Sequence, residues 1–398
     1  MAVRPGTPQL MRELNDRSAL DLLISAGPMT RAQIGARTGL SKVTAAQLLA
    51  RLEDRGLVAV VGEQTSGRGP NAALYGVVPS SAYVAGLEIG PRTATVAVAD
   101  ITGATIAEVR VDPDGVEQPA VVVHDAVQRA CDAAGIAMDR LHAVAIGTPG
   151  VVDPHSGDVR FAFDLPHWHE GVLGLLRSDL RRPVLIENDV NLVAIAEREY
   201  GCGRGTDDFA LVWIDRGVGL AVMLDRRLHR GRSGAAGEIG YLPVPGVPLP
   251  DTVRESESWG TPALAGGFGS LVSADAVLES ARKYGVPGAT VVECVRAGSE
   301  EFLDDLALRI SYGVAAVNIV LDPGLLVLAG ALGRAGGSAL ATRVESEVGR
   351  LCPTRPQVVV TGVDGNPVLR GALHSALERA REDVFSQHPI RMDDTPRA

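Results

Sequence analysis

The chain has 398 residues, of which 46% are hydrophobic, and this is enough for two or three domains with cores of their own. Because no apolar run approaches the ~20 residues that span a bilayer, and residues 1–10 lack a secretory pattern, we expect a cytoplasmic protein with no membrane partner. The four cysteines have no CxxC spacing, which argues against a zinc knuckle or a disulfide framework.

The net charge of −10 is unevenly distributed along the chain. Residues 1–80 contain nine basic and six acidic residues, whereas the remainder is strongly acidic. A polyanion would be repelled by such a body. Any nucleic-acid binding is therefore expected in the first 80 residues, which also hold Lys42, one of only two lysines.

Three helices and a hairpin are predicted in this basic segment. Leu10, Leu14, Leu20 and Leu23 indicate an amphipathic helix that ends near residue 26. A second helix begins at Thr30, which has capping-box spacing to Gln33, and a third begins at Ser41 as its N-cap. The third helix buries Ala45, Leu48, Leu49 and Leu52. Two short strands at residues 58–61 and 74–78 follow, joined by a glycine-rich loop.

This order of elements predicts a winged helix-turn-helix that binds double-stranded DNA. The helix from Ser41 would enter the major groove, and Arg68 in the glycine-rich wing would lie in the minor groove. The alternative is a helix-turn-helix used only for packing or protein contact. The candidate DNA-binding residues are Ser41, Lys42, Val43, Thr44, Gln47, Arg51 and Arg68.

From residue 83 onward, apolar strands alternate with long helices, which indicates an α/β fold. A second set of strands begins with FALVWIDRGVGLAVMLD and ends with VVVTG, so we expect two related lobes. A cleft between lobes is a usual place for a small ligand.

Four segments of the body carry a resemblance to a known family: IGTPGVVDPHSGDV, PVLIENDVNLVAIAEREYGCGRG, LHRGRSGAAGEIGYLPV and LDPGLLVLAGALGRAGG. They resemble the signatures of the ROK family of sugar kinases and transcriptional repressors. The resemblance implies a winged helix-turn-helix at residues 1–80 and a two-lobed, actin-like (ribonuclease H-like) sugar kinase fold at residues 81–398.

The phosphate-binding turns of the family's kinases are altered in this chain. The first turn resembles DIGGTK in the kinases, and here the stretch contains Glu88, Gly90, Pro91, Arg92 and Thr93. Pro91 has no N–H to donate to a phosphate. The second turn resembles LGTGIG, and Asp215 would place a carboxylate where the polyphosphate lies. We therefore expect that the protein neither binds ATP as a cofactor nor acts as a kinase.

The sugar-binding end retains more of the family's residues. By resemblance, Asn188, Asp189 and Glu238 would contact sugar hydroxyls, and Asp189 would be the general base in a kinase. The alternative is that these side chains cap helices and bind buried backbone. The candidate ligand-binding residues are Pro149, Gly150, Asn188, Asp189, Glu238 and Tyr241.

The zinc site of the family is not expected here. Tyr241 replaces its histidine, Ser270 and Val272 replace the last cysteine and a glutamate, and no thiolates remain to bind the metal. Tyr241 or Trp259 could instead stack on a sugar or fill the pocket. A second cluster, DLPHWHE, contains Asp164, His167, His169 and Glu170, but its spacing fits no helix face, so we expect no metal there either.

Taken together, the residues and the resemblance predict a transcriptional regulator, most simply a repressor of carbohydrate-related genes. Its body would be a sugar sensor and dimerisation scaffold, in a homodimer or a dimer of dimers. By resemblance to the family, the C-terminal helices, including the segment ALRISYGVAAVNIV, are candidates for the dimer contact. Two alternatives remain open: an active sugar kinase that carries a DNA-binding head, and a body that only oligomerises.

Overall fold

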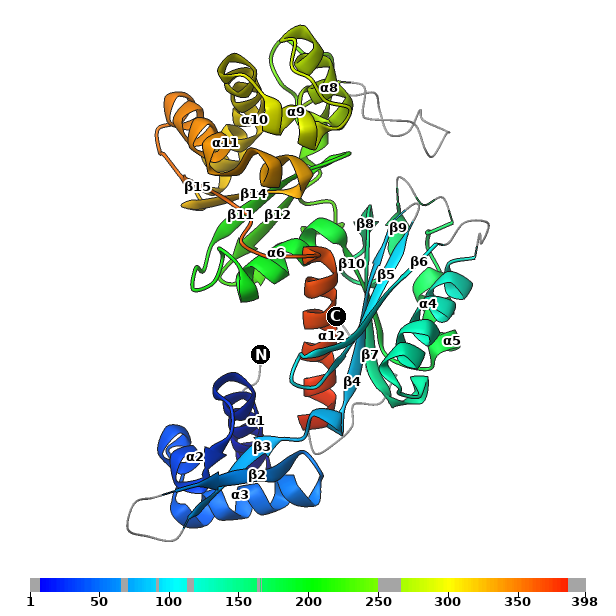
Figure 1. The fold of residues 1–398 in the computed structure, drawn as a ribbon, viewed down its shortest axis with the longest axis vertical. Helices are drawn as coiled ribbons and strands as arrows, with labels where there is room; N and C mark the ends of the chain where they lie inside the picture. Colours follow the sequence, from blue (N-terminus) through cyan, green and yellow to red (C-terminus); the bar gives the residue numbers. More distant parts are fainter. Residues whose placement is uncertain are drawn as a thin grey trace.

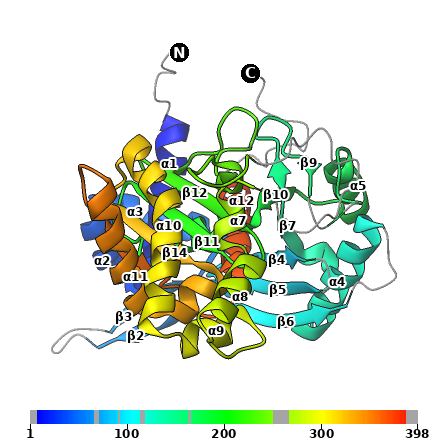
Figure 2. The ribbon, with the colours of Figure 1, turned by 90° about the horizontal axis from the view of Figure 1, so that it is seen from above.

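The computed structural model describes residues 8–65, 71–90, 93–112, 118–162, 165, 167–249 and 266–385. It consists of a small N-terminal head and a body of two lobes, each lobe built on a five-stranded sheet (Figures 1 and 2). The expected winged helix-turn-helix and two-lobed α/β body are both present.

The head contains α1 (Pro8–Ala26), β1 (Met29–Thr30), α2 (Arg31–Thr38), α3 (Lys42–Asp54), β2 (Val58–Gln64) and β3 (Ala72–Val77). The capping box predicted at Thr30 and Gln33 is confirmed, and Gly39 ends α2 in the left-handed conformation. Strands β2 and β3 form the expected antiparallel hairpin, and β1 adds a third strand that the sequence did not predict.

The core of the head is built from the apolar faces of its three helices. Ala45, Leu48, Leu49 and Leu52 of α3 are buried, as their helical spacing predicted. On α1, Leu20 and Leu23 are buried, but Leu10 and Leu14 are 41% and 50% exposed. The predicted apolar stripe of α1 therefore packs into the head only in its C-terminal half.

The first lobe has the sheet order β10-β7-β4-β5-β6, in which β4, β7 and β10 are parallel. Its elements are η1 (Pro79–Ser81), β4 (Tyr83–Ile89), β5 (Ala94–Asp100), β6 (Thr105–Val111), α4 (Pro119–Ala134), η2 (Met138–Arg140), β7 (Leu141–Thr148), β8 (Val151–Val152), β9 (Val159–Phe161), α5 (Val172–Leu180) and β10 (Val184–Asn188). Helices α4 and α5 pack together on one face of this sheet.

The second lobe has the sheet order β13-β12-β11-β14-β15. Its elements are α6 (Asp189–Tyr200), β11 (Phe209–Ile214), β12 (Val218–Leu224), β13 (Arg227–Leu228), η3 (Ile239–Tyr241), α7 (Gly269–Val272), α8 (Ala274–Lys283), α9 (Val291–Ala297), α10 (Glu300–Leu321), β14 (Leu325–Ala329), α11 (Gly330–Leu351) and β15 (Gln357–Val360). Helices α7 to α11 contribute to the core on the outer face of the sheet.

Helices α6 and α12 (Pro367–Phe385) lie between the two sheets and join the lobes (Figure 1). Gly371 of α12 lies so close to α6 that a Cβ atom there would come within 2.0 Å of the Leu192 carbonyl oxygen. One continuous apolar core runs from the head through α12 to α6 and the second sheet, and it includes Leu20, Leu373 and Phe385. The head is thus packed on the C-terminal half of α12.

Candidate functional site

The N-terminal end of α3 forms an exposed polar surface on the head. Ser41 caps the helix: its Oγ accepts a hydrogen bond from Thr44 N at 3.2 Å and lies 2.8 Å from Thr44 Oγ1. Lys42, Val43 and Gln47 are exposed, and Val43 keeps 67% of its surface accessible. An exposed valine beside polar groups is suited to a partner that has both apolar and hydrogen-bonding edges, such as the major groove of DNA.

Arg51 lies at the opposite end of α3 from this surface. Its Nη2 atom is 2.6 Å from Oδ1 of Asp16, a side chain on α1 with no exposed surface. The pair therefore ties α3 to α1, and Asp16 is a residue that sequence reasoning missed because 35 positions separate it from Arg51. Arg68, the candidate in the wing, lies outside the described residues.

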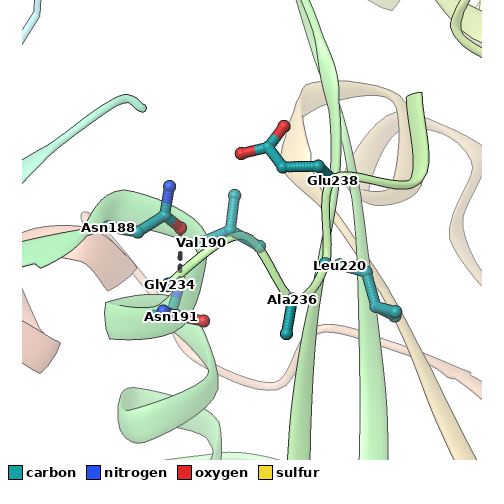
Figure 3. Close-up of a pocket in the computed structure, with 9 residues that line it drawn as sticks. Asn188, Val190, Asn191, Leu220, Gly234, Ala236 and Glu238 are labelled. Atoms are coloured by element: carbon teal, nitrogen blue, oxygen red, sulfur yellow. Dashed lines mark hydrogen bonds between the residues drawn. The ribbon is translucent and has the colours of Figure 1, made fainter. Parts of the chain in front are cut away.

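A second candidate site is a small pocket in the body at the start of α6 (Figure 3). Asn188 is the N-cap of α6: its Oδ1 accepts from Asn191 N at 3.1 Å, and its Nδ2 donates to the Gly150 carbonyl at 2.9 Å. Helix capping by Asn188 was one of the two expected roles. The pocket is lined by Asn188, Val190, Asn191, Gly219, Leu220, Gly234, Ala236, Gly237 and Glu238.

Two carboxylates approach each other at this pocket. Burial, and secondly the charge of Asp189, raises the pKa of Glu238 from 4.5 to about 7. Burial and the neighbouring Glu238 also raise the pKa of Tyr241. The pocket thus contains a carboxyl group that is partly protonated near neutral pH and can donate or accept a hydrogen bond.

The structure brings together most of the predicted ligand-binding residues, though not all as lining residues. Asn188 and Glu238 line the pocket, and the Gly150 carbonyl accepts the hydrogen bond that the Asn188 side-chain amide donates. Asp189 and Tyr241 lie close to Glu238 without being among the lining residues, and Pro149 precedes Gly150 in the loop after β7.

Glu187 and Arg230 are functional candidates that sequence reasoning passed over, although both lie in the quoted motifs. An Arg230 guanidinium nitrogen is 2.7 Å from Glu187 Oε2, and Asn191 Nδ2 donates to Glu187 Oε1 at 2.8 Å. These contacts hold the glycine-rich segment at residues 229–238 against the start of α6. In that segment, a Cβ atom at Gly237 would come within 1.9 Å of the Leu220 carbonyl oxygen, so only glycine fits there.

In each of the two turns that correspond by sequence to the kinase phosphate loops, backbone N–H groups donate to acceptors within the turn itself. In the hairpin between β11 and β12, Asp215 N donates to the Gly217 carbonyl at 2.9 Å, and Arg216 N donates to Asp215 Oδ1 at 2.9 Å. In the first turn, Gly90 N donates to the Thr93 carbonyl at 2.9 Å, and Glu88 accepts from the Asn366 amide. Pro91 and Arg92 lie outside the described residues.

Within the described ranges, no group of three or more His, Cys, Asp or Glu side chains could hold a metal ion. Ser270 Oγ donates to the Gly267 carbonyl at 2.8 Å, and Val272 is buried. His169 Nδ1 lies 3.0 Å from the Glu170 carbonyl oxygen, and His167 is exposed. Asp164 and Trp259 lie outside the described residues.

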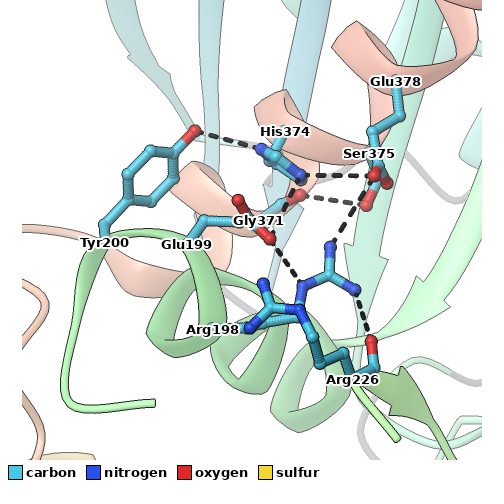
Figure 4. A network of polar contacts seen from close by, with 8 residues as sticks. All are labelled: Arg198, Glu199, Tyr200, Arg226, Gly371, His374, Ser375 and Glu378. Atoms are coloured by element: carbon cyan, nitrogen blue, oxygen red, sulfur yellow. Dashed lines mark hydrogen bonds and ion pairs between the residues drawn. The ribbon is translucent and has the colours of Figure 1, made fainter. Parts of the chain in front are cut away.

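Buried polar contacts connect α6 to the segment that returns from the second lobe to α12. Glu197, which has no exposed surface, accepts hydrogen bonds from Cys202 N at 2.8 Å, from Gly362 N at 3.0 Å, from Val363 N at 3.2 Å and from the Thr361 hydroxyl. Further along the two helices, Tyr200 OH lies 3.2 Å from His374 Nδ1, and Arg198 contacts Glu199 and Glu378 (Figure 4).

The described residues thus define a class of protein: a winged helix-turn-helix head on a two-lobed α/β body of the actin-like sugar kinase fold. A family model described as "ROK family" matches residues 84–377, which is most of the chain, and the protein belongs to that family. A model of the MarR family matches residues 14–69, which covers most of the head.

Relatives with known names include regulators. The chain is 26% identical over 278 residues to the DNA-binding transcriptional dual regulator NagC of Escherichia coli (strain K12), which covers 69% of this chain and 66% of NagC. It is 22% identical over 238 residues to the xylose repressor of Bacillus subtilis (strain 168), which covers 59% of this chain and 61% of that repressor. The chain thus spans just under two thirds of the length of these curated relatives.

Solved structures with the same fold include a regulator and a kinase. A ROK family transcriptional regulator described as a homolog of the E. coli MLC protein matches with a TM-score of 0.70 and 18% identity, over 93% of this chain and 98% of the other. The ROK hexokinase from Thermus thermophilus matches with a TM-score of 0.61 and 25% identity, over 75% of this chain and 99% of the other. No described helix has the length and apolar character needed to cross a membrane.

Proposed function

We propose that the protein is a DNA-binding transcriptional regulator, a repressor of carbohydrate-related genes that responds to a sugar or sugar derivative. The observation that carries this proposal is the exposed N-terminal face of α3, which presents Lys42, Val43 and Gln47 on a helix-turn-helix with an adjoining hairpin. The MarR-type head and the names of the relatives support it. A chromosomal operator as partner also implies a protein of the cytoplasm.

The proposed effector site is the pocket at the start of α6. Carboxylates are strong acceptors for sugar hydroxyls, and Glu238 and the neighbouring Asp189 could read hydroxyl positions on a polyol. The contact between Arg230 and Glu187 positions the glycine-rich segment across the same pocket. The pocket lies between α6, which is one of the two helices between the sheets, and β12 of the second sheet. A ligand bound there would change the equilibrium between open and closed arrangements of the lobes.

Helix α12 is the proposed path from this pocket to the head. Arg55, just after α3, donates to the Val384 carbonyl at the C-terminal end of α12. Arg381 of α12 donates to the Ile101 carbonyl, at 2.9 Å for its Nη2 atom. Burial raises the pKa of Asp21 in α1, and the charges of Arg17 and Arg381 oppose that shift, so Arg381 lies near α1. Since α12 contacts α6, the first sheet and the head, a change in lobe closure would change how the head is held.

We propose further that the body has no kinase activity and needs neither ATP nor zinc. Arg216 N and Asp215 N, two backbone donors of the second turn, already have acceptors within the turn, and a carboxylate stands beside them. The competing hypothesis is an active sugar kinase, since kinases share the fold. It requires sugar-dependent ATP hydrolysis that Asp189→Asn abolishes, and the absence of turnover would remove it.

A second copy of the chain is the proposed partner for α10. Leu308, Tyr312 and Ile319 recur on one face of this helix and are 37%, 37% and 62% exposed. Val320 beside them is 79% exposed. This segment is among the candidate dimer contacts named from the sequence. A contiguous group of exposed apolar side chains is typical of a protein–protein interaction surface.

The experiment that tests the function is recovery of genomic DNA fragments by the purified protein, with and without a panel of sugars and sugar phosphates, followed by sequencing. We expect a palindromic site near genes of sugar uptake or catabolism, released by one sugar. Failure to enrich any sequence would contradict the proposal. A site that no sugar releases, together with an unchanged melting temperature across the panel, would favour a body that only oligomerises.

A further inference from the structure

Four arginines form a cluster on the first lobe at the end nearest the head, and we call Arg140, Arg177, Arg181 and Arg182 the arginine patch. Strands β4, β7 and β10 are parallel neighbours, with Tyr83 opposite Leu141 and Val184 opposite Val144. Their N-terminal ends therefore lie at the same end of the sheet. Arg140 immediately precedes β7, Arg181 and Arg182 precede β10, and Arg177 lies in the last turn of α5. All four therefore lie at that end of the sheet.

The head joins the body at this same end of the sheet, where β4 begins. Arg140 Nη2 donates to the Ser80 carbonyl at 2.8 Å, in the segment between β3 and β4, and its guanidinium lies 5.3 Å from the Tyr83 ring centre. The C-terminal end of α12, which holds the head through Arg55, is also at this end of the lobe (Figure 1). The patch and the head are thus neighbours on one end of the molecule.

Three of the four guanidinium groups of the patch are held by backbone carbonyls, and that of Arg181 is exposed. Arg177 donates to Val184 O at 3.2 Å, Arg182 donates to Asp139 O and to Arg181 O, and Arg140 donates to Ser80 O. No described carboxylate forms a salt bridge with any of the four. Elsewhere in the body, carboxylates neutralise arginines such as Arg160, Arg198 and Arg355. The patch therefore concentrates positive charge on an otherwise acidic body.

One carboxylate acts on the patch without forming a salt bridge: burial lowers the pKa of Arg177, and the charge of Asp158 opposes that effect. The other neighbouring carboxylates contact residues outside the patch or are exposed. Asp179 contacts His124 at 2.7 Å, Asp383 contacts Arg379 at 3.3 Å, and Asp139 is exposed. Burial, and then Arg182 and Arg140, lowers the pKa of His142 in spite of Asp383. The Nε atom of Arg182 is buried and has no hydrogen-bond partner among the described residues. That buried atom cannot reach a partner, but Arg140 and Arg181 are exposed, and clustered guanidinium groups of like charge favour an anionic partner.

We propose that the arginine patch binds the phosphate backbone of double-stranded DNA that flanks the operator. This inference rests on the proposed function, because it adds a contact from the body to the DNA that the head binds. Double-stranded DNA is the polyanion favoured by the position of the patch beside the head. Guanidinium groups bind phosphate oxygens of the DNA backbone, and such contacts contribute affinity without sequence preference.

The test compares two duplexes that contain the recovered operator, a short one limited to the operator and a long one with flanks on both sides. Binding is measured over a range of salt concentrations for the wild type, for Arg181→Gln and for the double variant Arg181→Gln/Arg182→Gln. The wild type should bind the long duplex more tightly. Each lost phosphate contact should reduce the slope of log affinity against log salt by about 1, on the long duplex only.

The controls separate a local contact from general charge and from folding. Arg296→Gln removes an exposed arginine from α9 in the second lobe and should leave both duplexes unaffected. Arg181 is exposed and holds nothing through its side chain among the described residues, so Arg181→Gln should keep the wild-type melting temperature.

Three outcomes would overturn the proposal. If the wild type binds the operator but the long duplex keeps its advantage in the double variant, the patch does not contact flanking DNA and the regulator function stands. If the variant loses affinity for heparin but not for DNA, the patch serves another polyanion. If the wild type binds no DNA at all, both this proposal and the proposed function fail.

Discussion

Glu238 is the residue whose ionisation most directly links the pocket to pH. A carboxyl whose pKa is raised on folding, here from 4.5 to about 7, binds a proton more readily in the folded than in the unfolded protein. Its stabilising contribution is therefore complete below pH 4.5, declines as the pH rises and is lost above about pH 7. At higher pH the ionised carboxylate destabilises the folded state by up to about 3 kcal/mol, because each unit of pKa difference corresponds to about 1.4 kcal/mol.

Glu238→Gln should remove this dependence because the amide does not ionise. Thermal unfolding of wild type and variant should differ least at pH 5, and at pH 8 the variant should be the more stable protein. Glu301→Gln, at an exposed position of α10, is the matched control and should leave the pH profile unchanged. Parallel profiles for wild type and Glu238→Gln would mean that Glu238 is not desolvated.

Glu197 is the buried residue that ties α6 to the segment leading from β15 into α12. Its buried carboxylate accepts from Cys202 N, Gly362 N and Val363 N, and these donors would be left without an acceptor in Glu197→Ala. We expect the free energy of unfolding to fall by about 3 kcal/mol, measured by urea denaturation. Glu301→Ala should change it by less than about 0.5 kcal/mol. Equal losses in the two variants would remove the special role of Glu197.

How much could be predicted from the sequence depends on how far apart the contacting residues are. The caps formed by Thr30 and Ser41 involve partners within four positions, and the sequence predicted both. Glu197 contacts Val363 across 166 positions, and Asp16 contacts Arg51 across 35. No local pattern of residue types carries such pairings, so the anchoring of the lobes and of α3 became visible only in the fold.

At the scale of elements, α3 carries the proposed DNA contact, and Lys42 is its exposed cation. Lys42→Ala should weaken operator binding by about 3- to 10-fold and reduce the salt slope by about 1, because one phosphate contact is lost. Fluorescence anisotropy with a labelled operator measures both. The other lysine, Lys283 on α8, is paired with Glu279 at 3.0 Å, and Lys283→Ala is the control. Equal affinities for Lys42→Ala and wild type would mean that α3 is not the recognition helix.

The contact between α12 and α6 depends on the absence of a side chain at Gly371. In Gly371→Ala the new methyl group would overlap the Leu192 carbonyl oxygen at 2.0 Å, so the helices must move apart. We expect a loss of about 2–3 kcal/mol in stability, read from urea denaturation. Gly174→Ala, in α5 with nothing within 4 Å of the added atom, should be neutral or stabilising by about 0.5 kcal/mol. A Gly371→Ala protein as stable as wild type would contradict the close packing of the two helices.

The whole molecule combines one acidic body with a basic head, and its proposed regulation requires two heads at a fixed spacing. The continuous core through the head and α12 gives a physical route by which a change between the lobes could reach that spacing. Sequence motifs predicted the lobes and included two residues that line the pocket, Asn188 and Glu238. They gave no sign that α12 would also form part of the packing surface of the head. That role follows from where the C-terminal end of α12 lies in three dimensions.

Dimer formation through α10 is the prediction that belongs to this scale. Ile319→Asp places a charge in the exposed apolar face formed with Leu308 and Tyr312, and burying that charge in an interface would be costly. The variant should be monomeric in sedimentation equilibrium at concentrations at which the wild type is dimeric. It should also lose affinity for a palindromic operator far more than for a single half-site.

Leu175→Asp is the matched control for this experiment, since Leu175 on α5 is 59% exposed and lies on the other lobe. It introduces the same charge at a comparably exposed leucine, and it should leave the dimer intact in sedimentation equilibrium. If Ile319→Asp and Leu175→Asp behave alike, the dimer contact lies elsewhere. A loss of the dimer in Ile319→Asp alone, with an unchanged melting temperature at low concentration, would place the dimer contact at α10, and in a two-fold interface both copies would bring the new charge to that contact.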